Sequence, residues 1–185
     1  MIKKPDCNLA RRQFIQTISL ASAGLALYTP WSSLLANTPD RSLSFYHTHT
    51  GERIRLTYYS DGMYHKDALV ELNQYLRDFR TGDVYPIDAQ LFDVLYAARN
   101  ACESNGTFEV ISGYRSPKTN KMLRNAGGGV ARRSLHMDGK AIDVRLAGVK
   151  TSHLKKAAIH LKSGGVGYYA KSDFVHIDTG RVRTW

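Results

Sequence analysis

The chain has 185 residues, of which 43% are hydrophobic and 10% aromatic, and it is long enough to bury a globular core without disulfide staples. Its formal net charge of +10 favours an acidic partner, which can be a nucleic acid, an anionic membrane or a carboxylate-rich polymer. Its two cysteines are Cys7 and Cys102, and because Cys7 lies in a segment that we expect to be removed, the composition excludes a disulfide scaffold.

The first 36 residues have the order of an export signal: basic residues, an apolar run and a small-residue cleavage site. Arg11 and Arg12, followed by Gln13-Phe14-Ile15, resemble a twin-arginine signal. The apolar run is shorter than the roughly 20 residues that a membrane span needs. We therefore expect cleavage after Ala36 rather than retention as a membrane anchor.

Cleavage defines two predicted parts, a twin-arginine-type signal peptide over 1–36 and a single domain over 37–185. Loss of four basic residues and one acidic residue lowers the formal net charge from +10 to +7. A basic protein exported to the periplasm meets no nucleic acid and meets an anionic envelope polymer instead. We expect a monomer there, with no stable membrane insertion.

The remaining chain predicts a mixture of hairpins and helices. Residues 41–59 alternate in polarity around Thr50-Gly51, which predicts a β-hairpin. His47 and His49 share a face of it and could chelate a metal, but we interpret HTG at 49–51 as a turn with a surface histidine. Strands are further predicted over 107–112, 139–146, 165–170 and 174–182. Helices are predicted over 65–80, from the N-cap Asp88 to before Gly106, over 116–125 with Pro117 first, and over 153–162 capped by Thr151 or Ser152.

This order does not alternate strand and helix regularly. It therefore favours an α+β domain with a mainly antiparallel sheet and flanking helices.

The stretch SLHMDGKAID at 134–143 offers two candidate metal ligands, His136 and Asp143. Gly139 permits a tight turn into a strand, and alternation then places Ala141 and Asp143 on one face. Taken alone, such a segment is more often an ordinary turn and strand than a metal site. A zinc hydrolase site needs a third protein ligand and an open fourth position.

The third ligand is predicted from DFVHID at 173–178, where His176 lies in a strand. Asp173 falls in the turn before that strand, from which it could reach the same pocket as a general base. Asp178 shares the face of His176 and could orient a ligand.

A third stretch, SGYRSPKTN at 112–120, places Arg115 between a predicted strand and a predicted helix. An arginine there can bind a substrate carboxylate or stabilise an oxyanion. A purely structural pairing with an acid is the alternative.

The three stretches in this order resemble the zinc D-Ala-D-Ala peptidases, which belong to one metallopeptidase group with lysostaphin-type enzymes and the hedgehog signalling domain. The longer stretches HTGE at 49–52, SGYRSPKTN, and HIDTGRVRTW at 176–185 resemble a murein endopeptidase branch of that group. The resemblance covers nearly the whole chain.

The resemblance implies one Zn²⁺ per chain, bound by His136, Asp143 and His176. It implies that Asp173 deprotonates the attacking water and that Arg115 binds or polarises the substrate. Many members have Glu where this chain has Asp173, so the base has a shorter reach. The implied activity is hydrolysis of peptide cross-links of peptidoglycan, in this branch those between two diaminopimelate residues, with a role in cell wall growth or remodelling.

Two other functions remain open at this point. One is a D,D-carboxypeptidase or dipeptidase that trims stem peptides. The other is a non-catalytic wall-binding module in which zinc is structural, against which the carboxylate at Asp173 argues.

Overall fold

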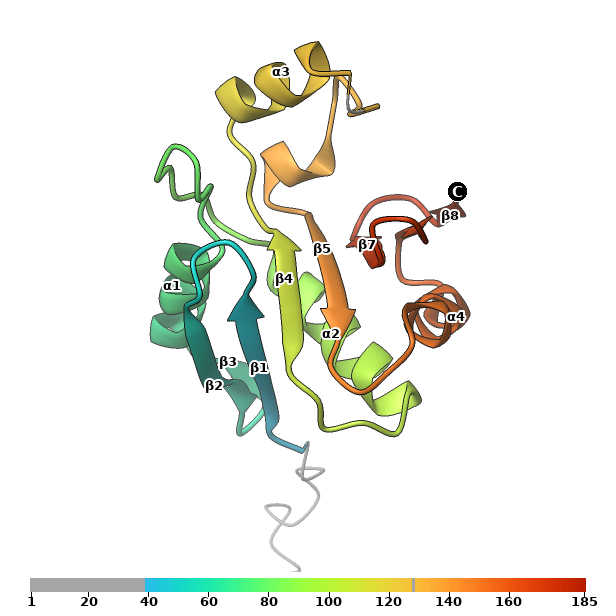
Figure 1. Cartoon of the computed structure of the whole chain (residues 1–185). Helices are drawn as coiled ribbons and strands as arrows, with labels where there is room; N and C mark the ends of the chain where they lie inside the picture. The colour runs from blue at the N-terminus through green and yellow to red at the C-terminus, as the bar shows by residue number, and fades with distance from the viewer. Residues whose placement is uncertain (1–38, 128) are drawn as a thin grey trace, which may run out of the picture. The chain divides into compact units, whose positions relative to one another are not determined.

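The computed structural model describes residues 39–127 and 129–185, which form one compact unit (Figure 1). The predicted signal peptide lies outside the described residues. Within the described ranges, no helix combines the length and the apolar character needed to cross a membrane.

An eight-stranded sheet organises this unit, in the order β3-β2-β1-β4-β5-β7-β6-β8. The pairs β1–β4 and β6–β8 are parallel and all other neighbours are antiparallel, so the predicted α+β fold with a mainly antiparallel sheet is confirmed. The strands are β1 (Arg41–His47), β2 (Arg53–Ser60), β3 (Met63–Tyr64), β4 (Phe108–Ser112), β5 (Ala141–Leu146), β6 (Gly165–Tyr169), β7 (Phe174–Asp178) and β8 (Arg183–Thr184).

Among the described residues, four α-helices and a short 3₁₀ helix accompany the sheet: α1 (Lys66–Tyr75), α2 (Ala89–Ala101), α3 (Pro117–Asn125), α4 (Thr151–Leu161) and η2 (Leu135–Asp138). The Asp88 side chain accepts a hydrogen bond from the Gln90 backbone N–H and caps α2, as predicted. The inward face of α2 is buried and includes Leu91, Val94, Leu95 and Ala98. They share one core with the sheet residues Phe108, Val110, Ile142, Val144 and Val175.

The hairpin β1–β2 is confirmed, with Gly51 in the left-handed region at φ +74°. His49 is exposed in the turn, as predicted, whereas only 1% of His47 is exposed. Its Nδ1 accepts from the backbone N–H of His49, and its ring lies edge-on to Phe79. Cys102 packs against the core as a partly buried side chain.

Two helix boundaries differ from the sequence prediction. Helix α1 ends at Tyr75 rather than near residue 80 because buried Asp78 accepts from the backbone N–H groups of Arg80 and Ser116, which turns the chain. Helix α4 uses Lys150 as N-cap rather than Thr151 or Ser152. The Thr151 hydroxyl donates instead to Asp173 Oδ1 (2.7 Å).

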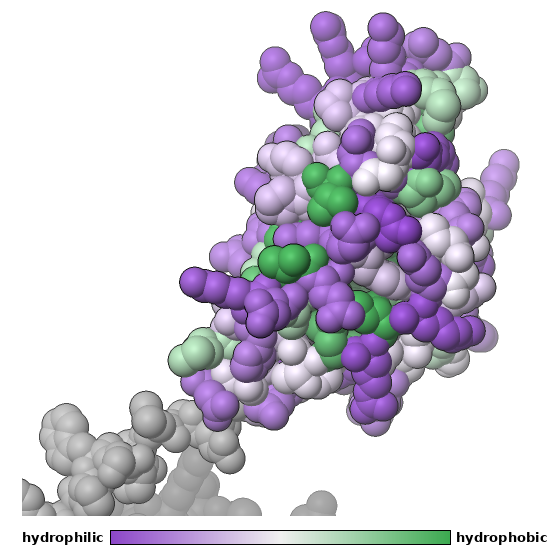
Figure 2. All heavy atoms as spheres, turned by 90° about the vertical axis from the view of Figure 1, so that its left-hand side faces the viewer, coloured by the Kyte–Doolittle hydropathy of each residue, from purple (hydrophilic) through white to green (hydrophobic). Residues whose placement is uncertain are grey.

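The helix α3 stands at one end of the described unit (Figure 1). Hydrophilic side chains gather there in Figure 2, and the exposed basic residues of this helix are Lys118, Lys121 and Arg124. The predicted cap and first residue of α3 are confirmed: Ser116 accepts from the Thr119 N–H, and Pro117 is first. Residues 113–116, between β4 and α3, bring Arg115 towards the middle of the sheet.

Candidate metal centre

His136 is positioned by the short helix η2, where sequence reasoning expected only a loop. Gly139 ends η2 in the left-handed region at φ +64°, and a Cβ there would collide with the carbonyl oxygen of Pro86. This close approach holds the turn against the 86–88 segment, whose Asp88 N–H donates to Gly139 O (2.9 Å). The Nδ1–H of His136 donates to Gly113 O (2.7 Å).

Asp143 lies on β5, on the sheet face opposite the Val144 side chain. The neighbouring strand β4 has an irregularity after Val110, so Ser112 rather than Ile111 is opposite Asp143. A bulge of this kind re-aims side chains. It brings the Ser112 hydroxyl to the same face as Asp143, where it accepts from Arg115 Nη2 (3.2 Å).

His176 lies on β7, directly opposite Asp143 in the antiparallel pair β5–β7. Its Nε2–H donates to Asp178 Oδ2 (3.1 Å), two residues further along the same face. Asp178 is fully buried and also accepts from the backbone N–H groups of Gly165 and Gly180 and from Arg183. The contact with His176 that the sequence suggested for Asp178 is therefore present.

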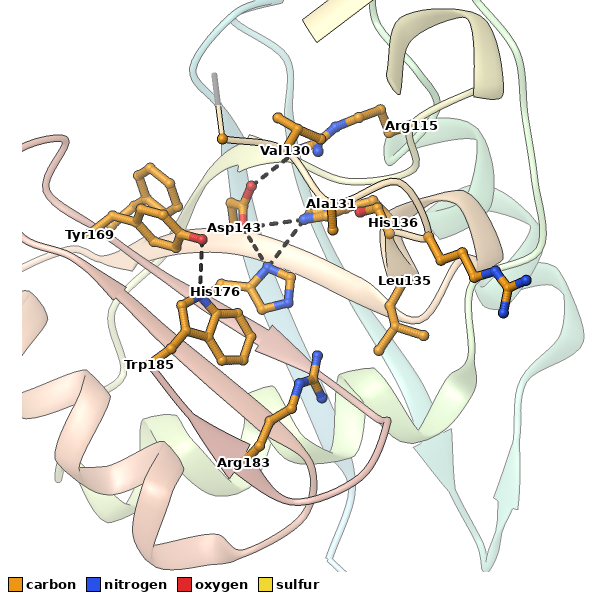
Figure 3. Close-up of a pocket in the computed structure, with 14 residues that line it drawn as sticks. Arg115, Val130, Ala131, Leu135, His136, Asp143, Tyr169, His176, Arg183 and Trp185 are labelled. Carbon is orange, nitrogen blue, oxygen red and sulfur yellow. Dashed lines mark hydrogen bonds and ion pairs between the residues drawn. The ribbon is translucent and has the colours of Figure 1, made fainter. Parts of the chain in front are cut away.

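The three predicted ligand residues come together in a triangle of inward-facing atoms (Figure 3). His136 Nε2 lies 3.2 Å from His176 Nδ1 and 3.3 Å from Asp143 Oδ1. The distance between His176 Nδ1 and Asp143 Oδ1 is 2.9 Å. Each histidine uses its other nitrogen to donate outward, to Gly113 O or to Asp178, so the inward nitrogen is the one free to coordinate. This arrangement fits a metal ion.

Charges in the triangle are strongly coupled because all three residues are buried. Burial lowers the pKa of His136, although the adjacent Asp143 opposes the shift. Burial alone would raise the pKa of Asp143, but His136 and His176 lower it below its usual range. For His176 the effect of burial is outweighed by hydrogen bonds to Asp143 and Asp178, which raise its pKa. A cation at the centre would satisfy the carboxylate that now depends on these histidines.

Arg115 lies beside the triangle, with its Nη2 3.4 Å from Asp143 Oδ2. Its backbone N–H donates to His136 O (3.1 Å), which ties the 113–116 segment to η2. The pairing with an acid that we considered as the structural alternative is thus present, and that acid is itself a predicted ligand. Arg115 Nε is buried without a hydrogen-bond partner among the described residues.

Asp173 is not brought into this group. It occupies the predicted turn before β7, in the left-handed region at φ +50°. Its Oδ1 accepts from the Thr151 hydroxyl and its Oδ2 lies 3.6 Å from Arg145 Nη1, and 60% of its side chain is exposed. The carboxylate is therefore held by the start of α4 and by β5, two residues along from Asp143.

A cavity of about 380 Å³ opens over the triangle. Residues that the sequence did not single out as site residues line it, among them Arg133, Tyr169, Arg183 and Trp185. Strand alternation could have found Tyr169, because its partner in the hairpin, Phe174, has the parity of His176. The position of Trp185 depends on the parallel pairing of β8 with β6, which no local pattern announces.

Comparison with known proteins gives one family. Residues 36–185 match the family described as Peptidoglycan L,D-endopeptidase MepK. The chain belongs to this family. The Peptidoglycan L,D-endopeptidase MepK of Escherichia coli K12 is 38% identical over 182 residues, covering 98% of this chain and 99% of that one. The Probable peptidoglycan L,D-endopeptidase MepK of Haemophilus influenzae is 42% identical over 172 residues, covering 91% and 92%.

Among solved structures, the L-Ala D-Glu endopeptidase ChiX of Serratia marcescens is 21% identical, with a TM-score of 0.35 over 51% of this chain and 68% of its own.

Proposed function

We propose that this protein is a zinc peptidase that hydrolyses peptide cross-links of peptidoglycan, with L,D cross-links between diaminopimelate residues as its substrate. The observation that carries the proposal is the buried His136–Asp143–His176 triangle at the base of a cavity, in a member of the MepK family. Full-length relatives named for L,D-endopeptidase activity support the choice of bond.

One Zn²⁺ per chain would be held by His136, Asp143 and His176. Two imidazoles and one carboxylate are a donor set that zinc accepts in catalytic sites, with one position left open. Bound zinc would supply a Lewis acid that polarises the scissile carbonyl and activates water. Gly113 O and Asp178 fix the two rings through their outward nitrogens and so hold the donors in place.

Arg115 would bind the substrate next to the metal. Its guanidinium presents several donors in a fixed plane, and its contacts to Ser112 and Asp143 both use the one nitrogen Nη2. The remaining donors can take a diaminopimelate carboxylate or the oxyanion that develops during attack.

Asp173 would act as the general base. To do so, its carboxylate has to leave Thr151 and Arg145 and turn towards the cavity, a movement for which its 60% exposed side chain has room. The base role thus includes a side-chain movement when substrate binds.

The proposed substrate requires export, because peptidoglycan lies outside the cytoplasm. We infer that residues 1–36 are a twin-arginine-type signal and that the domain over 37–185 works as a monomer in the periplasm. The family match begins at residue 36, which supports this boundary. The exposed basic residues of α3 suit an anionic polymer (Figure 2).

The test uses a defined L,D-cross-linked muropeptide dimer and the chain from residue 37, with zinc and with a chelator. We expect two monomers whose masses place the cut at the cross-link, and no product after chelation. Release of a terminal D-Ala alone would identify a carboxypeptidase instead. A dimer left intact under zinc-replete conditions, with binding retained, would identify a wall-binding module.

A further inference from the structure

Strand β6 has glycines at two positions that lie beside the C-terminal segment, which pairs with it as β8. A Cβ on Gly165 would collide with the guanidinium of Arg183 and with Asp178, and a Cβ on Gly167 would lie 2.6 Å from the indole of Trp185. Gly167 is directly opposite His176 in the β6–β7 pair. The two glycines therefore form a slot in the sheet face that bears the metal triangle.

Trp185 fills this slot beside a predicted metal ligand. Its indole centre lies 5.2 Å from the imidazole of His176, and the guanidinium carbon of Arg183 is 4.8 Å from the indole ring. Arg183 is itself held by Asp178, whose Oδ2 lies 2.7 Å from Arg183 Nη2. The indole is thus fixed on three sides and forms part of the cavity wall (Figure 3).

Tyr169 continues this wall. Its ring stacks on Phe174 with 4.6 Å between centres and 15° between planes, which fixes the direction of the phenol. The indole Nε1–H of Trp185 donates to the Tyr169 hydroxyl oxygen over 3.0 Å. Figure 3 shows this contact on the side of the triangle away from Arg115.

The direction of that hydrogen bond determines what Tyr169 can do. An indole N–H only donates, so the Tyr169 oxygen must be the acceptor. Its own proton is left available, and the structure shows no acceptor for it among the described residues. Tyr169 is 41% exposed and lines the cavity, so this donor is accessible to a molecule bound there.

We propose that the Tyr169 hydroxyl donates a hydrogen bond to an oxygen of the peptide bound at the metal centre, and that Trp185 positions that hydroxyl. The proposal rests on the proposed peptidase function and adds a substrate contact across the triangle from Arg115. The peptide is then held between a cationic side and an aromatic side. The Tyr169 hydroxyl belongs to the cavity wall and does not contact the metal. Its hydrogen bond therefore stabilises the bound peptide before the reaction, and its loss should change KM rather than kcat.

The first test replaces only the hydroxyl. Tyr169→Phe keeps the ring stacked on Phe174, and Tyr168→Phe is the matched control because Tyr168 alternates to the other face of β6. For Tyr169→Phe we expect KM for the muropeptide dimer to rise about tenfold and kcat to stay within about twofold, as loss of one hydrogen bond to substrate predicts. Zinc content and melting temperature should match those of the parent, and the control should keep its KM.

The second test replaces the positioning group. Trp185→Phe retains an aromatic ring over Gly167 but has no N–H, so KM should rise by about two- to fivefold with zinc content unchanged. Added to Tyr169→Phe, it should raise KM no further, because the two side chains act through one hydroxyl.

An unchanged KM in Tyr169→Phe overturns the proposal, as does a fall in kcat alone or a loss of zinc that accounts for the whole effect. Failure of the proposed function would look different, since the parent chain itself would then leave the dimer intact. In that case the affinity of the parent and of Tyr169→Phe for the dimer, measured by calorimetry, still decides whether the hydroxyl contacts it.

Discussion

At the scale of single residues, the two histidines of the triangle show how a donor set is prepared. His136 and His176 each donate one N–H outward, to a backbone carbonyl or to buried Asp178, and thereby turn the other nitrogen inward. The carbonyl of Gly113 is in reach because a glycine there lets the segment approach Leu76, with the Tyr114 N–H donating to Leu76 O (2.8 Å). Ring orientation is thus set before any ion arrives.

Replacement of Asp173 by Asn tests the proposed base. The amide keeps the size of the side chain but cannot take a proton, so kcat/KM should fall on the order of 10² to 10⁴-fold. Zinc content should stay near one per chain and the melting temperature should hardly move, because the side chain is 60% exposed. Asp138→Asn, at an exposed position next to His136, is the control and should keep full activity. A fully active Asp173→Asn variant would assign the base elsewhere.

At the scale of elements, the parts of the site that could be predicted are those set by local periodicity. Strand alternation and the His-x-x-Gly turn placed His136, Asp143 and His176 on segments that the structure brings together. The side-chain direction of Asp173 could not be predicted, because it depends on a left-handed turn residue and on tertiary contacts to Thr151 and Arg145.

For the fold too, the features set by local sequence could be predicted and those set by distant contacts could not. Capping and periodicity predicted the β1–β2 hairpin, α2 and α3. The early end of α1 results from buried Asp78, whose partner Ser116 lies 38 residues away. The slot for Trp185 results from the pairing of β8 with β6. No local sequence pattern predicts this pairing either.

Gly139 provides a prediction for the element η2. Gly139→Ala has to accommodate both a left-handed backbone and a collision with Pro86 O, so the free energy of unfolding should fall by about 3 kcal/mol or more. Gly148→Ala is the matched control, since φ is +78° there but no atom lies within 4 Å of the added Cβ, and its cost should be about 1 kcal/mol. Urea unfolding measures both. Equal costs would mean that the approach to Pro86 does not constrain η2.

At the scale of the whole molecule, pH couples to stability through a buried histidine outside the metal triangle, His47. Burial lowers the pKa of His47 to about 4, and His49 and Arg77 add to the shift while Glu52 opposes it. The folded protein therefore keeps His47 neutral at a pH where the unfolded chain, with an ordinary histidine pKa near 6.5, takes up a proton. Stability falls as the pH drops from about 6.5 towards 4.

Between pH 7.5 and pH 5, His47 should account for about 2 kcal/mol of the decrease in the free energy of unfolding. His47→Gln should lose that much less over the same interval, because glutamine does not titrate. His160→Gln, at an exposed position of α4, serves as the control and should follow the parent. Denaturant unfolding at the two pH values checks this, and an identical decrease in parent and His47→Gln would contradict it.

The glycine slot in β6 lets metal binding and the fit of the peptide depend on different residues, whereas many enzymes build both properties from the same residues. The triangle comes from η2, β5 and β7, whereas Arg183 and Trp185 reach the cavity from the edge strand β8 and its end. Side chains on an edge strand can change without disturbing the pairing of central strands. Exchange of Trp185 would therefore alter which peptides fit while leaving the donor set intact, whereas Arg183 is tied to the donor set because it holds Asp178, the partner of His176.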